Sequence, residues 1–279
     1  MLVRQRQEVQ ALPRELSAPD ATRKLLGGEE RILEWEGCFN VRDLGRLPAR
    51  EGARTRWGAV VRSDIPSRLT ERGRAALVAH GISTIVDLRA DHEVTSDAEL
   101  YPFREPSPGH PSYRHVPFNV WDDEAPGRVA RDRAAQTREE MNPLDLDINA
   151  RGIASAVAAV ADAPPGGVLV HCHAGKDRTG IVVALILTLV GVSDDDIADD
   201  YSLTMLNLEP LIAEWIDTID EADRDRMRAL ATPRREAMLA TLEHLRERYG
   251  GAEKYLLGAG ASADQIARIR ERLVGPNNG

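Results

Sequence analysis

The chain has 279 residues, 42% of them hydrophobic and 29% charged, and its formal net charge at pH 7 is −9. This composition is ordinary for a folded protein in water, and the length allows a sizeable core. The acidic balance argues against nucleic acid as a general partner, because nucleic-acid phosphates carry the same sign of charge.

The amino-terminal residues 1–30 are polar and charged and include prolines and a glycine pair, which predicts a loosely attached arm. The first residues, MLVRQRQE, carry charges where a signal peptide has an apolar run. The longest apolar run, near 181–192, is shorter than the ~20 residues of a membrane span. We therefore expect a cytoplasmic protein without stable membrane insertion.

The remaining residues, 31–279, are predicted to form a single domain, because apolar segments run through them without a linker-like break. Short apolar runs typical of strands occur at 57–62, 82–88, 113–118 and 167–171, and helical spacing occurs at 70–80, 148–162, 180–191, 194–206, 208–222, 233–248 and 262–274. This alternation predicts an α/β fold with a mostly parallel central sheet, helices on both faces and a helical C-terminal part.

Residues 171–180 read HCHAGKDRTG and form the most informative motif of the chain. The run GVLV leads in from residue 167 and IVVALIL follows from residue 181, which is the pattern of a strand, a tight loop and a helix. Such a loop gathers backbone N–H groups around one point at the positive end of a helix dipole. The motif therefore predicts a binding site for a phosphate-sized dianion.

The side chains of this loop indicate nucleophilic chemistry at phosphorus. Helix N-termini and nearby cations lower the pKa of a cysteine, so we expect Cys172 to be a thiolate. Its attack would leave a cysteinyl phosphate, which water then hydrolyses. The guanidinium group of Arg178 is planar and can donate to two phosphate oxygens at once. We expect Thr179 to donate its hydroxyl hydrogen to the thiolate, and His171 to hold the loop from behind.

The leaving oxygen needs a proton from a general acid. Asp177, beside the arginine, is the first candidate, and Asp122 and Asp123 in the segment PFNVWDD are the second. The residues leave this choice open. Lys176 adds a second cation, suited to substrates that carry more than one phosphate.

Two further groups of residues have alternative interpretations. Arg42, Arg62 and Arg89 lie at or near predicted strand ends, and we expect them to line a cationic pocket rather than to be solvated surface residues. Cys38, the other cysteine, is expected to be a buried spectator. The alternative is a protective disulfide with Cys172 under oxidation.

The chemistry requires no metal or other cofactor. The acidic run Asp194-Asp195-Asp196 resembles a metal-binding cluster, but acidic residues are also favoured at the N-terminus of a helix. Ser193 is a suitable cap for such a helix. We therefore predict a helix start there and no metal site.

The loop resembles the signature of the protein tyrosine phosphatase superfamily, in which five residues separate a cysteine from an arginine. More narrowly, the chain is similar to the bacterial atypical tyrosine phosphatases of the mycobacterial type over roughly residues 30–275. The segments that carry this similarity are 171–180, 40–45 (NVRDLG), 61–64 (VRSD), 86–89 (VDLR) with Glu93, and 249–260.

The resemblance implies a protein-tyrosine phosphatase that hydrolyses phosphotyrosine, and with it phosphoserine, phosphothreonine or phosphoinositides. It implies Cys172 as nucleophile, Arg178 as phosphate ligand and Asp177 as the acid. The residues expected to bind the substrate phosphate are His173, Ala174, Gly175, Lys176, Arg178 and Thr179, and the supporting residues are His171, Arg62, Arg89 and Asp122.

Residues 120–147 are rich in charges and turn formers and form either a solvated connection or a mobile lid. The resemblance favours the lid, because relatives have a helical lid in this region. Some relatives also act outside the cell without a recognisable signal, so secretion is the alternative location.

The chain departs from the family where relatives read Pro-Phe-Pro-Asp and this sequence reads PFNV at 117–120. The role of an aspartate on this separate loop is therefore open. His173 stands where relatives can have an aromatic residue, and it lies either on the pocket rim or on the surface. A phosphoinositide or inositol phosphate phosphatase is the alternative function, and a non-catalytic phosphate-binding module is a further one.

Overall fold

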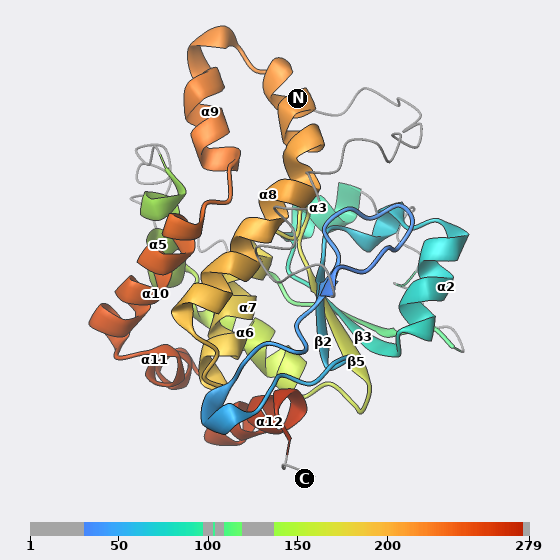
Figure 1. The fold of residues 1–279 in the computed structure, drawn as a ribbon, viewed down its shortest axis with the longest axis vertical. Helices are drawn as coiled ribbons and strands as arrows, with labels where there is room; N and C mark the ends of the chain where they lie inside the picture. The colour runs from blue at the N-terminus through green and yellow to red at the C-terminus, as the bar shows by residue number, and fades with distance from the viewer. Residues whose placement is uncertain (1–30, 97–102, 104–108, 119–136, 276–279) are drawn as a thin grey trace.

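The computed structural model describes residues 31–96, 103, 109–118 and 137–275 (Figure 1). Three sequence predictions therefore lie outside the described residues: the arm at 1–30, the aspartates Asp122 and Asp123, and the first part of the segment 120–147.

The centre of the fold is a five-stranded sheet in the order β1-β2-β5-β3-β4. The strands are β1 (Arg42–Asp43), β2 (Val60–Ser63), β3 (Ile82–Asp87), β4 (Ser112–His115) and β5 (Gly167–His171). β1 is an antiparallel edge strand beside β2, and the other four strands are parallel. The predicted α/β fold with a mostly parallel sheet is confirmed.

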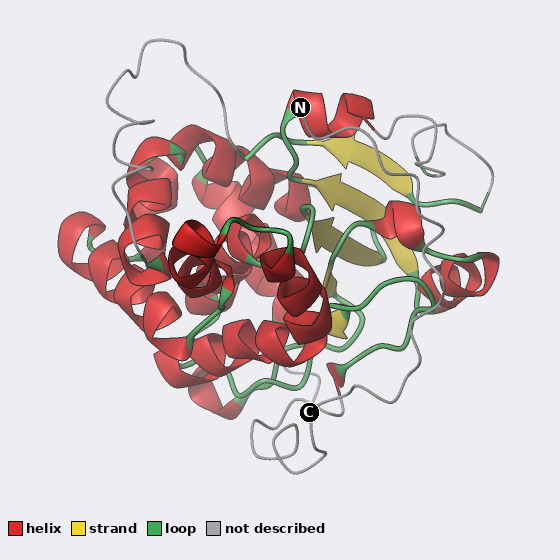
Figure 2. Cartoon of the chain, turned by 90° about the horizontal axis from the view of Figure 1, so that it is seen from above, coloured by secondary structure: helices red, strands yellow, loops and turns green. Residues whose placement is uncertain are grey.

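Helices cover both faces of the sheet, which explains why β5 is buried throughout and apolar up to His171. Val168 and Val170 face the larger core, formed with α6 (Ala150–Ala161), α7 (Asp177–Leu189) and the C-terminal helices. Leu169, between them, faces a smaller core that includes Leu77 of α2 (Glu71–Ala79). Figure 2 shows most helices gathered on one side of the strands. The carboxyl end of β5 is therefore enclosed by packed elements.

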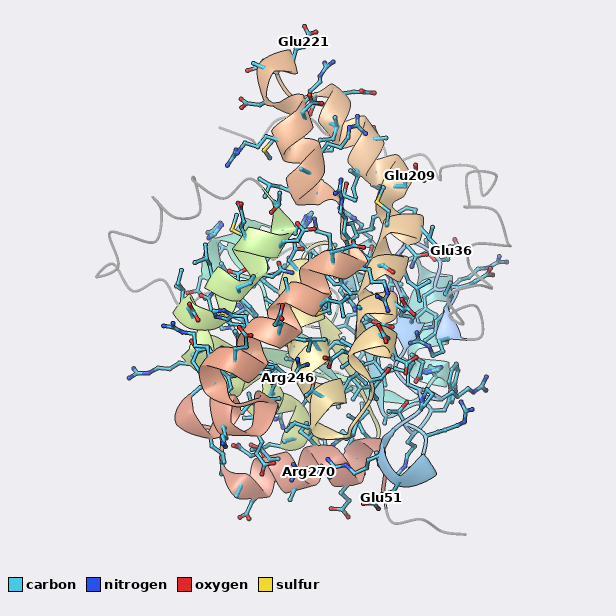
Figure 3. The ribbon with its side chains drawn as sticks, turned by 60° about the vertical axis from the view of Figure 1, so that its left-hand side comes forward. Glu36, Glu51, Glu209, Glu221, Arg246 and Arg270 are labelled. Carbon is cyan, nitrogen blue, oxygen red and sulfur yellow. The ribbon has the colours of Figure 1, made fainter. Side chains whose placement is uncertain are left out.

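The C-terminal part is helical, as predicted, with α8 (Asp194–Asp217), α9 (Arg224–Ala231), α10 (Arg235–Tyr249), α11 (Ala252–Gly258) and α12 (Ala263–Leu273). The sequence predicted separate helices at 194–206 and 208–222, which was wrong, since α8 is one unbroken helix across residue 207. The predicted cap is confirmed, because Asp196 N donates to Ser193 Oγ over 3.1 Å. Glu221 marks the tip beyond α8 and α9, at the opposite end from Arg270 of α12 (Figure 3).

Two further helices flank the loop region: α3 (Asp91–Ser96) and α5 (Arg138–Ile148). α5 accounts for the described part of the segment expected to be a lid, and it packs against α10. Among the described residues, no helix is both long enough and apolar enough to cross a membrane.

Candidate active site

The predicted phosphate loop lies between the carboxyl end of β5, at His171, and the start of α7, at Asp177. β5 is a central strand, and Cys172 directly after it is only 3% exposed. Gly175 in the loop has φ of 64°, and a Cβ there would lie 2.2 Å from the carbonyl oxygen of Ser63. The tight approach of the loop to β2 therefore requires glycine.

The carbonyl groups of the loop are bound by groups behind it. Asn40 Nδ2 donates to the carbonyl oxygens of Ala174 at 2.9 Å and Gly175 at 3.2 Å. Arg62 Nη2 donates to those of Gly175 at 2.8 Å and Lys176 at 3.3 Å. These bonds turn the carbonyl oxygens away from the mouth of the loop.

The first half of the loop is bound in the same way. The amide of Ile65 donates to the carbonyl oxygen of His173 over 3.0 Å, and His171 Nδ1 lies 2.8 Å from that of Cys172. His171 Nε2 is 3.7 Å from Oδ2 of Asp87. His171 thus holds the loop from behind, where the sequence placed it.

Arg178 forms a bidentate ion pair with Glu93 of α3. Nη1 bonds Oε2, and Nη2 bonds Oε1 at 2.9 Å. Burial opposes the charge of Glu93, but the hydrogen bonds from Arg178 lower its pKa from 4.5 to about 2. Burial likewise opposes the charge of Arg178, and the Glu93 carboxylate and Cys172 hold the pKa of Arg178 above its usual value. Both groups are therefore charged at neutral pH.

Asp177, the candidate acid, is bound by three neighbours. Tyr201 donates to its Oδ1 at 3.0 Å, and its Oδ2 lies 3.1 Å from Arg138 Nη2 and 3.4 Å from Lys176 Nζ. Burial raises the pKa of Asp177, but the Arg138 and Lys176 cations bring the net pKa below its ordinary value. In this conformation Asp177 is an ionised carboxylate.

Lys176 and Arg138 also bind the end of α9. Lys176 Nζ donates to the carbonyl oxygens of Ala231 at 2.7 Å and Leu230 at 3.3 Å, and Arg138 Nε donates to that of Leu230 at 2.6 Å. Cations are favoured at the C-terminus of a helix, where the dipole is negative. The two side chains therefore connect the loop, α5 and α9.

A cavity of about 300 Å³ adjoins the end of the loop. Its lining comes from α3, α5 and the first residues of α7: Ala90, His92, Glu93, Arg138, Met141, Asp145, Asp177 and Arg178. Another cavity, of about 570 Å³, is lined by Gly58 and Gly167 at the amino ends of β2 and β5, away from the loop. The smaller cavity is therefore the one adjacent to the predicted chemistry.

The expectation that Arg42, Arg62 and Arg89 line a phosphate pocket is wrong. Each is at most 1% exposed. Arg42 and Arg62 pair with Asp200 of α8, and Arg89 pairs with Asp87 at 2.7 Å. Because their charges are satisfied by buried carboxylates, they support the loop region from behind.

Three smaller expectations have separate outcomes. Thr179 is buried, but within the described part of the chain its Oγ1 has no hydrogen-bond partner, so the expected donation to Cys172 is not made in this conformation. His173 is exposed at the loop.

Cys38 and Cys172 are both free thiols, and Cys38 Sγ donates to the carbonyl oxygen of Ile65 at 3.5 Å. Burial raises the pKa of the Cys38 thiol.

Several contacts of the site had no signal in the sequence. Arg138 and Tyr201 lie far from the loop along the chain, and Asp200 is one acid among many at the start of α8. Glu93 and Asn40 fell within segments of family resemblance, but their hydrogen bonds to the loop depend on tertiary packing.

A buried cysteine at the start of an anion-binding loop, with an arginine six residues later at the start of a helix, defines a cysteine-dependent phosphatase. Residues 33–275 match the family model described as the tyrosine phosphatase family, and the chain belongs to this family. It is a protein-tyrosine phosphatase whose substrates are phosphoproteins.

The chain is 29% identical over 278 residues to the triple specificity protein phosphatase PtpB of Mycobacterium tuberculosis, covering 88% of this chain and 99% of that protein. It is 28% identical over 241 residues to a tyrosine-protein phosphatase of Nostoc commune, covering 82% of this chain and 78% of that one. The similarity therefore extends well beyond the loop.

Proposed function

We propose that the protein hydrolyses phosphotyrosine through a cysteinyl-phosphate intermediate on Cys172. The observation that carries this proposal is the orientation of the loop, whose carbonyl oxygens bond to Asn40 and Arg62 behind it. The loop amides then face the position of a bound phosphate. The Cys172 sulfur attacks phosphorus, an S–P bond forms, and the bond from phosphorus to the tyrosine oxygen breaks.

Arg178 is the proposed phosphate ligand. Its pairing with Glu93 uses one hydrogen on each Nη and leaves Nε and the second hydrogen on each Nη for phosphate oxygens. Glu93 therefore fixes the plane of the guanidinium without removing its ability to bind the substrate. Charge stabilisation of the transferring phosphoryl group is the main contribution expected from such a residue.

Asp177 is the proposed acid for the tyrosine oxygen and the base for the water that cleaves the S–P bond. Its ionised form suits the second of these steps directly. A substrate phosphate that attracts Arg138 and Lys176 weakens their pairing with Asp177, which raises the pKa of the carboxyl toward the value a proton donor needs. Asp122 and Asp123, outside the described residues, are the alternative donors.

We propose phosphoserine and phosphothreonine as further substrates, in keeping with the name of the mycobacterial relative. A phosphoinositide is not favoured, because the two relatives are named as phosphatases of proteins. A cytoplasmic location stays a prediction of the sequence.

The test measures phosphate release from a phosphotyrosine peptide, a phosphoserine peptide and a phosphatidylinositol monophosphate, with a chelator present. We expect turnover with the phosphotyrosine peptide to be fastest and to disappear in Cys172→Ser. A Cys172→Ser protein as active as wild type contradicts the cysteine mechanism. A faster reaction with the lipid contradicts the proposed substrate class.

A further inference from the structure

Behind the phosphate loop, one buried carboxylate is surrounded by three buried guanidinium groups. Asp200 of α8, 1% exposed, accepts from Arg31 Nη1 at 2.8 Å, Arg42 Nε at 3.1 Å and Arg62 Nη1 at 2.7 Å. The arginines are 4%, 0% and 1% exposed. Arg42 also donates to the backbone oxygen of Asp200, at 2.6 Å. Asp200 therefore joins β1, β2 and the chain before β1 to one turn of α8.

Two of these guanidinium groups connect to the loop, Arg62 directly and Arg42 through Asn40. Arg62, held by Asp200 at Nη1, donates from Nη2 to the carbonyl oxygens of Gly175 and Lys176. Arg42 donates from Nη1 to Oδ1 of Asn40 at 2.6 Å. That bond turns the amide nitrogen of Asn40 toward the carbonyl oxygens of Ala174 and Gly175. Two chains of hydrogen bonds thus connect the Asp200 carboxylate to the back of the loop, one through Arg62 and one through Arg42 and Asn40.

These two chains of hydrogen bonds set the direction of the loop amides. A peptide unit is planar and trans, so its C=O and N–H point in opposite directions. When the carbonyl oxygens of residues 174 and 175 are drawn backward, the N–H groups of Gly175 and Lys176 point forward. We propose that Asp200 is a positioning residue for the phosphatase reaction, acting through Arg62 and Arg42 to keep the loop amides directed at the phosphate; this rests on the proposed function of the loop.

The cluster also carries an excess of positive charge, three guanidinium groups against the Asp200 carboxylate. Burial and the neighbouring Arg62 lower the pKa of Arg42 to about 9. Burial raises the pKa of Asp200, but the three arginines outweigh it and hold the pKa of this carboxyl below its usual range. Removing the carboxylate leaves these cations to repel one another and to release their hold on the loop.

The experiment compares Asp200→Asn and Arg62→Lys with Asp43→Asn, which removes a different fully buried carboxylate. The Asp43 carboxylate accepts from the amides of Gly45 and Gly58 and lies 2.8 Å from His80 Nε2. None of these partners is in the loop, so the variant controls for loss of stability. The readouts are kcat/KM with a phosphotyrosine peptide, the inhibition constant of orthovanadate, and thermal unfolding, with activity measured well below each unfolding temperature. Arg62→Lys keeps the charge but cannot bridge Asp200 and the loop.

We expect kcat/KM and vanadate affinity to fall by on the order of 100-fold in Asp200→Asn and Arg62→Lys, the size of effect seen when a reacting group is slightly misplaced. Asp43→Asn is expected to lower the unfolding temperature and to leave both constants within about twofold of wild type. If Asp200→Asn does not fold, the outcome with Arg62→Lys decides. The proposal is overturned if a folded Asp200→Asn or Arg62→Lys keeps the kcat/KM and the vanadate inhibition constant of wild type. It is also overturned if Asp43→Asn loses as much kcat/KM and vanadate affinity as these variants. Failure of the proposed function is separate, because wild type itself would then show no turnover dependent on Cys172.

Discussion

The back and the front of the phosphate loop are held in different ways. At the back, Asn40 and Arg62 donate to backbone carbonyl groups of the loop, Asp200 binds Arg62, and all three residues are at most 1% exposed. At the front, Asp177 and Arg178 are about a fifth exposed and form side-chain ion pairs, Asp177 with Arg138 and Lys176 and Arg178 with Glu93. The back fixes the backbone, whereas the front consists of side-chain ion pairs, of which those of Asp177 are weakened by a charged substrate. Substitutions on the two sides should therefore differ in what they change.

The largest effect is expected at the front, from Arg178→Ala. Loss of the guanidinium removes the charge that stabilises the transferring phosphoryl group, and kcat/KM for a phosphotyrosine peptide should fall by about 10³-fold. Arg178→Lys should lose most of this activity as well, because an ammonium cannot pair with Glu93 and phosphate in one plane. A kcat/KM of Arg178→Lys close to that of wild type would show that the planar guanidinium group is not needed.

Asp177→Asn is expected to lower kcat by about 10²-fold, since the amide can neither give nor take a proton. The loss should be smaller with a substrate whose leaving group is a weak base, such as p-nitrophenyl phosphate, because that oxygen needs less protonation. Asp145→Asn removes another carboxylate of the same cavity for comparison and should lose much less activity. Equal losses with both substrates would assign the proton to another residue.

Gly175→Ala tests the back of the loop. The new Cβ would lie 2.2 Å from the carbonyl oxygen of Ser63, at a φ of 64°, so we expect a loss of about 2 kcal/mol in the free energy of unfolding. Gly81→Ala is the matched control, because its φ is also positive and no atom lies within 4 Å of the added carbon. Chemical denaturation of both variants should separate steric contact from backbone strain. Equal losses would contradict the close approach to β2.

The smallest effect is expected from Glu93→Gln, about 1 kcal/mol at neutral pH, because the ion pair with Arg178 is partly exposed. Glu93 has a folded-state pKa of about 2, below its ordinary 4.5. Its contribution to stability is therefore complete above pH 4.5 and is lost as the pH falls toward 2. The difference in unfolding free energy between wild type and Glu93→Gln should narrow over that range. A difference that is constant with pH would contradict the pairing.

The parts of the molecule that could be predicted from sequence are those determined locally. The strand, loop and helix around Cys172 follow from an apolar run, a tight turn and a second apolar run. The start of α8 follows from the Ser193 cap. The residues also indicated that Arg178 and Asp177 belong to one site, because they are adjacent in the motif.

The parts that could not be predicted depend on packing between distant segments. Arg42 and Arg62 looked like free cations because their partner, Asp200, stands in an acidic run that gives no sign of burial. α5 and α9 have few apolar residues, and their stability comes from contacts with α10 and α8. α8 is continuous at residue 207, where the sequence suggested a break between two helices.

The depth of the Asp200 cluster has a consequence for ionic strength. Dissolved ions screen charges that face water and have much less effect on buried pairs. Added salt should therefore weaken the Arg178–Glu93 pair and the attraction of a phosphoprotein to the site, while the peptide groups of the loop keep their direction. The salt dependence of the reaction then reports on the ion pairs at the front of the site and not on the cluster behind the loop.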